Sequence, residues 1–177
     1  MSQLASILIH QAKQNHETTL DLGNCSLTEL PYELFELVWL ETLILSNSWS
    51  EYNFDNQKWE LCFSQNKGDF NTILNNIKHL SPKLASLKKL KNLIVNKQDL
   101  SNISSLKDLT QLQVLDISST QVSDLSSLKG LTQLQILRIN QTQVSDLTPL
   151  EDLTLLQILL IYCTPVSDLK PLAHLTS

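Results

Sequence analysis

A 22-residue period of apolar residues runs through the second half of the chain. From Leu90 onward, leucine, isoleucine or valine returns at matching positions of four successive units without a slip in register. Residues 120–137 read TQVSDLSSLKGLTQLQIL, and residues 142–159 nearly restate them as TQVSDLTPLEDLTLLQIL. Such a period predicts a solenoid, in which each unit adds one layer to a shared core.

Two spacings of apolar residues alternate within each unit. The segment Leu115–Ile117 alternates with period two, which is typical of a short strand with alternate side chains pointing inward. Leu125, Leu128 and Leu131 lie three residues apart, the period of a 3₁₀ turn. We therefore expect parallel stacked strands, each followed by a turn segment that returns to the next strand. The residues expected to accept main-chain N–H groups at the start of these turns are Asn102, Asp124, Asp146 and Asp168.

The unit LxxLxIxxTxVxDLxxLxxLxx resembles the leucine-rich repeat, in the 22-residue form of internalin-like bacterial proteins. The resemblance implies an α/β solenoid, a horseshoe with short parallel strands on its concave face and 3₁₀ turns or loops on its convex side. The family usually has asparagine where this chain has Thr120, Thr142 and Thr164, and those asparagines hydrogen-bond the loop backbone as a ladder. Threonine offers one hydroxyl, so we expect a weaker ladder here, interrupted at Gln98.

Longer repeats precede the regular ones. Two further strands are predicted at Leu20–Leu22 and Leu43–Leu45, and Cys25 takes the asparagine position, which the family also fills with cysteine. The segment LDLGNCSLTELPYELFEL is similar to the start of the repeat domain in bacterial Roco-type GTPases. No GTPase segment accompanies it in this sequence.

The pattern organises the chain as one domain over residues 1–177. Residues 2–16 predict an amphipathic helix that caps the open core of the first repeat. The residues expected on its apolar face are Leu4, Ile7, Leu8 and Ala12. After this cap we expect the first repeats at 17–48, an insertion at 49–74, and the return path with the regular repeats at 75–177.

The insertion is recognised because the repeat register fails after Leu45 and resumes at Asn75, where NNIKHLSPKL parallels CSLTELPYEL. Alternation on both sides of DNQK in YNFDNQKWELCF predicts a small hairpin. Insertions in solenoids often lie on the binding face. The aromatic rings either pack the hairpin onto its own repeat or leave one or two rings exposed for a partner. These aromatic residues are Trp49, Tyr52, Phe54, Trp59, Phe63 and Phe70.

Composition and charge limit the classes of partner. A hydrophobic content of 42%, with 3 glycines and 5 prolines, indicates a folded domain rather than a disordered chain. The net charge of -5 gives no general attraction to nucleic acid or to an anionic membrane, and no apolar stretch is long enough to cross a bilayer. A local basic cluster is expected to be solvated or, as an alternative, to bind an acidic partner: Lys83, Lys88, Lys89, Lys91 and Lys97.

Residue patterns that carry chemistry are missing from the sequence. Cys25, Cys62 and Cys163 are far apart and show no CxxC spacing, so neither a disulfide framework nor a thiolate metal site is predicted. Phosphate-binding, dinucleotide-binding, zinc-protease and nucleophile-elbow motifs are absent. We therefore predict no catalytic residue, metal or cofactor, and no enzyme activity. Reduced thiols and the lack of a signal-peptide pattern at the start indicate a cytoplasmic location.

The side chains that point out of the strands form three columns along the concave face, starting at Thr19, Asp21 and Gly23. These columns are more apolar than a solvated surface requires, and contiguous exposed apolar side chains usually mark an interaction site. The alternative is that β-branched residues stand there because they favour strands. Asp116 and Arg138 could orient a partner or pair with each other. The predicted partner-binding residues are Ile44, Ile94, Val114, Asp116, Ile136, Arg138, Asn140, Ile158, Leu160 and Tyr162, with Trp49, Tyr52 and Trp59 of the insertion.

These features predict a bacterial, intracellular module that binds another protein through its concave face and the insertion. Two alternatives stay open: a regulatory or dimerising domain of a larger signalling enzyme such as a Roco-type GTPase, and an internalin-like surface adhesin. The sequence stops after PLAHLTS without a polar capping segment. We expect either a fragment of a longer protein or self-association through the uncapped C-terminal edge.

Overall fold

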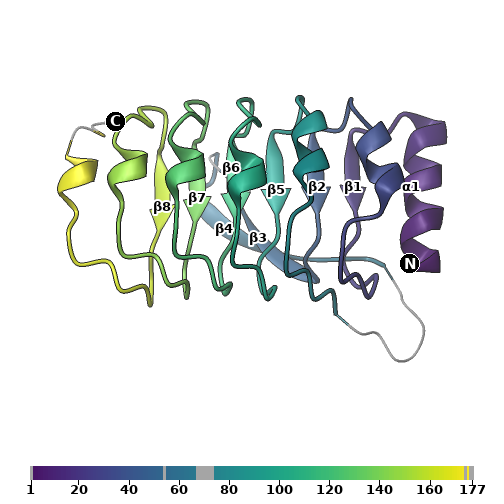
Figure 1. The fold of residues 1–177 in the computed structure, drawn as a ribbon, viewed down its shortest axis with the longest axis horizontal. Helices are drawn as coiled ribbons and strands as arrows, with labels where there is room; N and C mark the ends of the chain where they lie inside the picture. Colours follow the sequence, from purple (N-terminus) through teal and green to yellow (C-terminus); the bar gives the residue numbers. More distant parts are fainter. Residues whose placement is uncertain (1, 54, 67–73, 174, 176–177) are drawn as a thin grey trace.

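Six short parallel strands, stacked one repeat apart, form the main sheet in the order β1-β2-β5-β6-β7-β8 (Figure 1). The computed structural model describes residues 2–53, 55–66, 74–173 and 175. Each strand begins one residue before the position that the apolar pattern indicated, because the residue in front of the first inward leucine already pairs with its neighbour. The strands are β1 (Thr19–Asp21), β2 (Thr42–Ile44), β5 (Asn92–Ile94), β6 (Val114–Asp116), β7 (Ile136–Arg138) and β8 (Ile158–Leu160).

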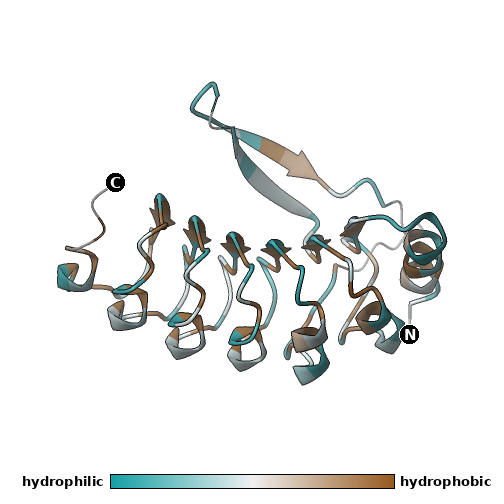
Figure 2. Cartoon of the chain, turned by 90° about the horizontal axis from the view of Figure 1, so that it is seen from above, coloured by the Kyte–Doolittle hydropathy of each residue, from teal (hydrophilic) through white to brown (hydrophobic). Residues whose placement is uncertain are grey.

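The return segments lie on the side opposite the sheet, and each contains one 3₁₀ turn (Figure 2). At η4, the Asp124 carboxylate accepts the N–H of Ser126 at 2.8 Å, and Asn102, Asp146 and Asp168 do the same at their own turns. The predicted turn-start acceptors are therefore confirmed. The turns are η1 (Tyr32–Glu36), η2 (Pro82–Ser86), η3 (Ser104–Leu106), η4 (Ser126–Leu128), η5 (Thr148–Leu150) and η6 (Lys170–Leu172).

One continuous leucine core fills the space between the sheet and the turns, and helix α1 (Gln3–Asn15) closes its N-terminal end. The predicted helical cap is confirmed, although its buried face differs from the expected one. Ala5, Ile9 and Ala12 are buried, whereas Ile7 is 48% exposed. The helix is rotated so that Ala5, Ile9 and Ala12 face the first repeat, while Leu4 and Leu8 are partly buried against the same core. Each leucine of the core stabilises the fold by roughly 1.5–3 kcal/mol relative to an exposed position.

The polar ladder beneath the strands is uneven. Asn75 donates to the carbonyls of Leu22 (2.8 Å) and Leu45 (2.7 Å) and accepts the N–H of Leu27 at 2.8 Å. The expectation that Gln98 interrupts the ladder is wrong, because its longer side chain accepts the N–H of Ile77 at 3.0 Å and donates to a carbonyl of its own repeat. The threonines make one bond each, from the hydroxyl to the strand carbonyl three residues earlier: Thr120, Thr142 and Thr164.

The insertion after β2 forms the predicted hairpin, with β3 (Ser48–Asn53) antiparallel to β4 (Lys58–Phe63). It begins at Ser48, one residue earlier than expected. Figure 2 shows the hairpin rising over the concave side of the sheet. The chain that returns from β4 is tied to the first repeat, because Asn66 donates to the carbonyls of Asp21 and Gly23. Phe54 and Phe70 lie outside the described residues.

Candidate functional site

The hairpin covers the centre of the concave face. Trp49, at the start of β3, packs against Ile44 of β2 and Ile94 of β5, and the three side chains are 9%, 5% and 5% exposed. Ile136 of β7 is also buried. The exposure that the sequence analysis expected for these isoleucines is therefore not found, because the insertion supplies the cover. Their role in partner binding stays a prediction.

An ion pair fastens the hairpin to the sheet. Arg138 Nη1 lies 3.1 Å from Asp116 Oδ2 and donates to the Ser50 carbonyl at 2.6 Å. The Arg138 guanidinium also lies over the ring of Trp59, 4.9 Å from its centroid. Asp116 is fully buried and accepts further hydrogen bonds from Asn96 Nδ2 and from a main-chain N–H. Of the two alternatives considered from sequence, Asp116 and Arg138 pair with each other.

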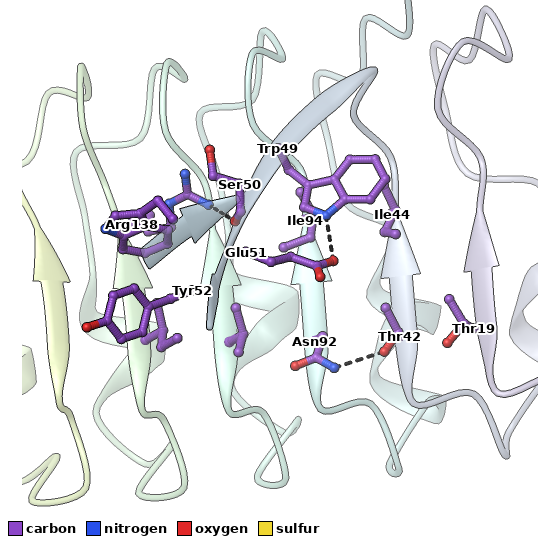
Figure 3. A pocket seen from close by; sticks show the side chains of 13 residues that line it. Thr19, Thr42, Ile44, Trp49, Ser50, Glu51, Tyr52, Asn92, Ile94 and Arg138 are labelled. Atoms are coloured by element: carbon purple, nitrogen blue, oxygen red, sulfur yellow. Dashed lines mark hydrogen bonds between the residues drawn. The ribbon is translucent and has the colours of Figure 1, made fainter. Parts of the chain in front are cut away.

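A cleft of about 360 Å³ remains between the hairpin and the N-terminal ends of the strands (Figure 3). Two hydrogen bonds fix polar side chains in it: Asn92 donates to Thr42 at 2.9 Å, and the Trp49 indole donates to the Glu51 carboxylate at 2.8 Å. Concave, mostly apolar clefts with a few fixed polar groups are typical of binding sites. Its lining residues are Thr19, Thr42, Ile44, Trp49, Ser50, Glu51, Tyr52, Trp59, Asn92, Ile94, Val114, Ile136 and Arg138.

A second, more open cleft of about 310 Å³ lies on the other side of the hairpin. Asn140 and Tyr162 line it, and the Asn140 side-chain oxygen accepts the N–H of Tyr162 at 2.8 Å. Tyr162 is 73% exposed. Ile158 and Leu160, the remaining predicted residues, are half-buried in the last strand and line neither cleft. The hairpin thus separates Asn140 and Tyr162 from most of the other predicted site residues.

Sequence reasoning missed the polar part of the first cleft: Thr19, Thr42, Ser50, Glu51 and Asn92. Thr19, Thr42 and Asn92 stand in one concave column, directly opposite one another across β1, β2 and β5. The repeat pattern had already predicted that these three residues share a column, so the column could have been included in the predicted site. Glu51 was also reachable, because it lies two residues from Trp49 and therefore on the same face of β3.

The thiols and lysines show no further site. Among the described residues, no group of three metal-ligating side chains occurs, and no helix in the described part has the length and apolarity needed to span a bilayer. Burial and the nearby Asp21 carboxylate raise the pKa of Cys25 to about 12. Cys163 is exposed. Two lysines of the basic cluster contact different neighbours: Lys91 lies 2.9 Å from the Glu41 carboxylate, and Lys97 donates to Ser48 at 2.9 Å.

Comparison with known proteins gives a family match over part of the chain. The family described as leucine-rich repeats in two copies matches residues 110–152. No curated protein sequence matches the chain significantly.

Solved structures extend the likeness to most of the chain. An internalin (inlF) from Listeria monocytogenes is 27% identical with a TM-score of 0.64, over 84% of this chain and 36% of its own. The leucine-rich-repeat protein LIC12759 from Leptospira interrogans is 20% identical with a TM-score of 0.69, over 88% and 34%. The chain thus spans about a third of the length of each. The ectodomain of the plant receptor kinase GASSHO1/SCHENGEN3 from Arabidopsis thaliana, in complex with CASPARIAN STRIP INTEGRITY FACTOR 2, is 19% identical with a TM-score of 0.66, over 98% and 18%.

These likenesses agree with the repeat positions, the parallel sheet and the 3₁₀ return turns. The similarity of the first repeats to Roco-type GTPases stays a prediction. Residues 110–152 therefore match the leucine-rich-repeat family, and the chain has the solenoid fold of internalins and other leucine-rich-repeat proteins.

Proposed function

We propose that the chain is a protein-interaction module whose binding site is the cleft between the hairpin and the sheet, and not the whole concave face. The observation that carries this proposal is the apolar cleft of about 360 Å³ that the hairpin leaves over β2 to β7. The plant receptor ectodomain in complex with its integrity factor has the same fold, which supports a protein partner. The matching family is a repeat family, which supports binding over catalysis.

The cleft has room for a few side chains and not for a folded domain. A fitting partner therefore presents an extended segment or a protruding loop. Val114 is half-buried on the cleft floor, and Trp49, Tyr52 and Trp59 stand at its hairpin wall, so an apolar or aromatic side chain is the expected insert. Glu51 is exposed at the same wall. Its carboxylate favours a lysine or arginine beside that apolar residue.

Phage-displayed peptides, selected on the immobilised wild-type chain and then synthesised, test this proposal. Val114→Arg places a long charged side chain in the cleft, whereas Thr132→Arg makes the same change on an exposed turn outside it. We expect Val114→Arg to weaken peptide binding by about tenfold or more and Thr132→Arg to leave it unchanged. Thermal unfolding of both variants shows that the fold is retained.

Equal binding of the selected peptides to Val114→Arg and to the wild type would overturn the cleft as the binding site. Glu51→Lys gives an independent test, because basic residues in the selected peptides should then become unfavourable. Its carboxylate accepts only the Trp49 indole among the hydrogen bonds of the described residues.

The 27% identity to an internalin favours the surface adhesin over the Roco-type signalling domain as the second candidate function. The cytoplasmic location inferred from sequence is part of the first proposal. Fractionation of the source cells separates the two, because an adhesin is found with the cell envelope and an intracellular module with the cytosol.

A further inference from the structure

The outer strand of the hairpin carries three large apolar residues in alternate positions. Trp59, Leu61 and Phe63 of β4 are 40%, 66% and 57% exposed. Because they are two residues apart, their side chains share one face of the strand. Exposed apolar edge strands are rare in stable monomers, since they invite pairing with another chain. This strand therefore has the composition of an interface.

The alternation of hydrogen-bonded and non-hydrogen-bonded pairs in the hairpin shows which main-chain groups of β4 point away from β3. Ser64 N–H donates to the Asn47 carbonyl at 2.9 Å, which makes this pair a hydrogen-bonded one. Bonded and non-bonded pairs alternate in an antiparallel ladder. Trp59, Leu61 and Phe63 are therefore in non-bonded pairs, and their N–H and C=O groups point away from β3.

The contact of β3 with the sheet agrees with this assignment of bonded and non-bonded pairs. Ser50, opposite Leu61, must also point its carbonyl away from the hairpin, and that carbonyl accepts the bond from Arg138. One outer edge of the hairpin is thus held by the sheet. On the β4 edge, only the Phe63 carbonyl has a hydrogen-bond partner within the described residues, the side-chain amide of Gln65 at 3.0 Å.

We propose that β4 pairs antiparallel with β4 of a second copy of this chain, about a twofold axis at Leu61. In this register Leu61 lies opposite the partner's Leu61, and Trp59 lies opposite the partner's Phe63. If the register slipped by one residue, main-chain groups that point away from β3 would face partner residues whose main-chain groups are already bonded to β3. If it slipped by two residues, one hydrogen-bonded pair between the two β4 strands would be lost. The axis at Leu61 therefore uses all the outward-pointing residues of Lys58–Phe63.

A second copy fits this edge because the strand is self-complementary. Pairing joins the exposed Trp59, Leu61 and Phe63 of both copies into one apolar patch. On the opposite face Glu60 lies across from the partner's Cys62, so no like charges are directly opposed. The hairpin rises over the concave side of the sheet (Figure 2), and β3 is the strand that the Arg138 bond holds to the sheet, so β4 is the outer strand. The proposal does not rest on the proposed function: of the β4 residues only Trp59 also lines the peptide cleft, and Leu61 and Phe63 do not.

Cysteine crosslinking tests the register. In a background of Cys62→Ser and Cys163→Ser, Leu61→Cys places two thiols across a bonded pair, with Cα atoms about 5.5 Å apart, within disulfide range. Phe63→Cys is the matched control, since its two thiols would be four residues out of register, about 13 Å apart. We expect oxidation to give a covalent dimer for Leu61→Cys and none for Phe63→Cys. A monomer for Leu61→Cys, or equal crosslinking of both, would overturn the register.

Light scattering over a concentration series tests the surface. We expect the wild type to approach twice the 20.0 kDa of one chain and Leu61→Lys to remain at the monomer mass. Leu155→Lys is the control, because Leu155 is 43% exposed in the turn before β8. A wild type that stays monomeric would overturn the proposal. A dimer that persists in Leu61→Lys would also overturn it, and would assign self-association to another surface such as the C-terminal edge.

Discussion

Arg138 and Asp116 form a buried ion pair at the centre of the concave face, with Nη1 3.1 Å from Oδ2. The same Arg138 nitrogen donates to the Ser50 carbonyl of the hairpin. One guanidinium therefore neutralises a carboxylate of the sheet and fixes the position of an inserted strand 88 residues away in sequence. The pair links the regular repeats to the element that shapes the cleft.

Replacement of Arg138 by methionine should destabilise the fold and release the hairpin. Asp116 would stay buried without its charge partner, so we expect the free energy of unfolding in urea to fall by about 3–5 kcal/mol. Hydrogen exchange in β3 should become faster, because Ser50 loses its anchor. The double variant Asp116→Asn, Arg138→Met should recover part of the stability, since it removes the unpaired charge. A loss below about 1 kcal/mol for Arg138→Met, with unchanged exchange, would contradict this account.

Asn75 and Thr142 occupy the same repeat position, but they should contribute different amounts to the free energy of unfolding. Asn75→Ala leaves two carbonyls and one N–H without their partner, and we expect a loss of about 3 kcal/mol or more. Thr142→Val removes a single donor, with an expected loss of about 1 kcal/mol. Urea denaturation of both variants measures the difference. Equal losses would show that the ladder bonds are not what distinguishes the two sites.

Gly23 should be required at its position by the backbone of the neighbouring repeat and by the chain that returns from the hairpin. A Cβ there would lie 2.4 Å from the Ser46 carbonyl oxygen and 2.6 Å from the Ser64 Cβ. We expect Gly23→Ala to cost about 1–3 kcal/mol, because backbone must move to relieve the overlap.

Gly130→Ala is the matched control for this substitution. A Cβ at Gly130 meets nothing within 4 Å, so the change should be neutral or stabilising by about 0.4–1 kcal/mol. The midpoint of thermal unfolding should therefore fall for Gly23→Ala, and it should stay unchanged or rise for Gly130→Ala. A similar loss in both would argue against the packing explanation.

The repeat register could be predicted from sequence because each apolar column is defined by local spacing. The concave columns, the 3₁₀ turns and the place of Asn75 in the ladder all follow from residues one period apart. Ile7 and Gln98 were misjudged for a different reason. Their roles depend on how the helix rotates against the first repeat and on how far a side chain reaches, which the period does not encode.

The candidate site was harder to predict, because it depends on a contact between distant segments. The alternation of apolar and polar residues predicted the hairpin, but it did not predict that the hairpin folds over the concave face of the sheet. Nothing in the local pattern indicates that Arg138 binds the Ser50 carbonyl or that Trp49 covers Ile44 and Ile94. The apolar concave columns suggested an open binding surface, and the structure shows that part of their apolarity serves the packing of the insertion.

Cys25 should make the stability of the protein fall at high pH. Its pKa is raised from 9.0 to about 12, first by burial and then by the Asp21 charge, and its thiol donates to the Gly23 carbonyl at 3.5 Å. Between pH 9 and 12 the folded chain keeps a proton that the unfolded chain has lost. This contribution to stability is therefore complete below pH 9 and declines as pH rises, by at most about 1.4 kcal/mol per pH unit.

Comparison with Cys25→Ala isolates this thiol from the tyrosines and lysines that titrate in the same range. The difference in unfolding free energy between wild type and variant should shrink as pH rises from 8.5 to 10.5, because only the wild type must keep a neutral thiol buried. A thiol reagent at pH 8 gives a second reading: Cys163, which is exposed, should react, and Cys25 should react only on unfolding. A constant difference in stability across the pH range would show that Asp21 and burial do not hold the Cys25 thiol neutral.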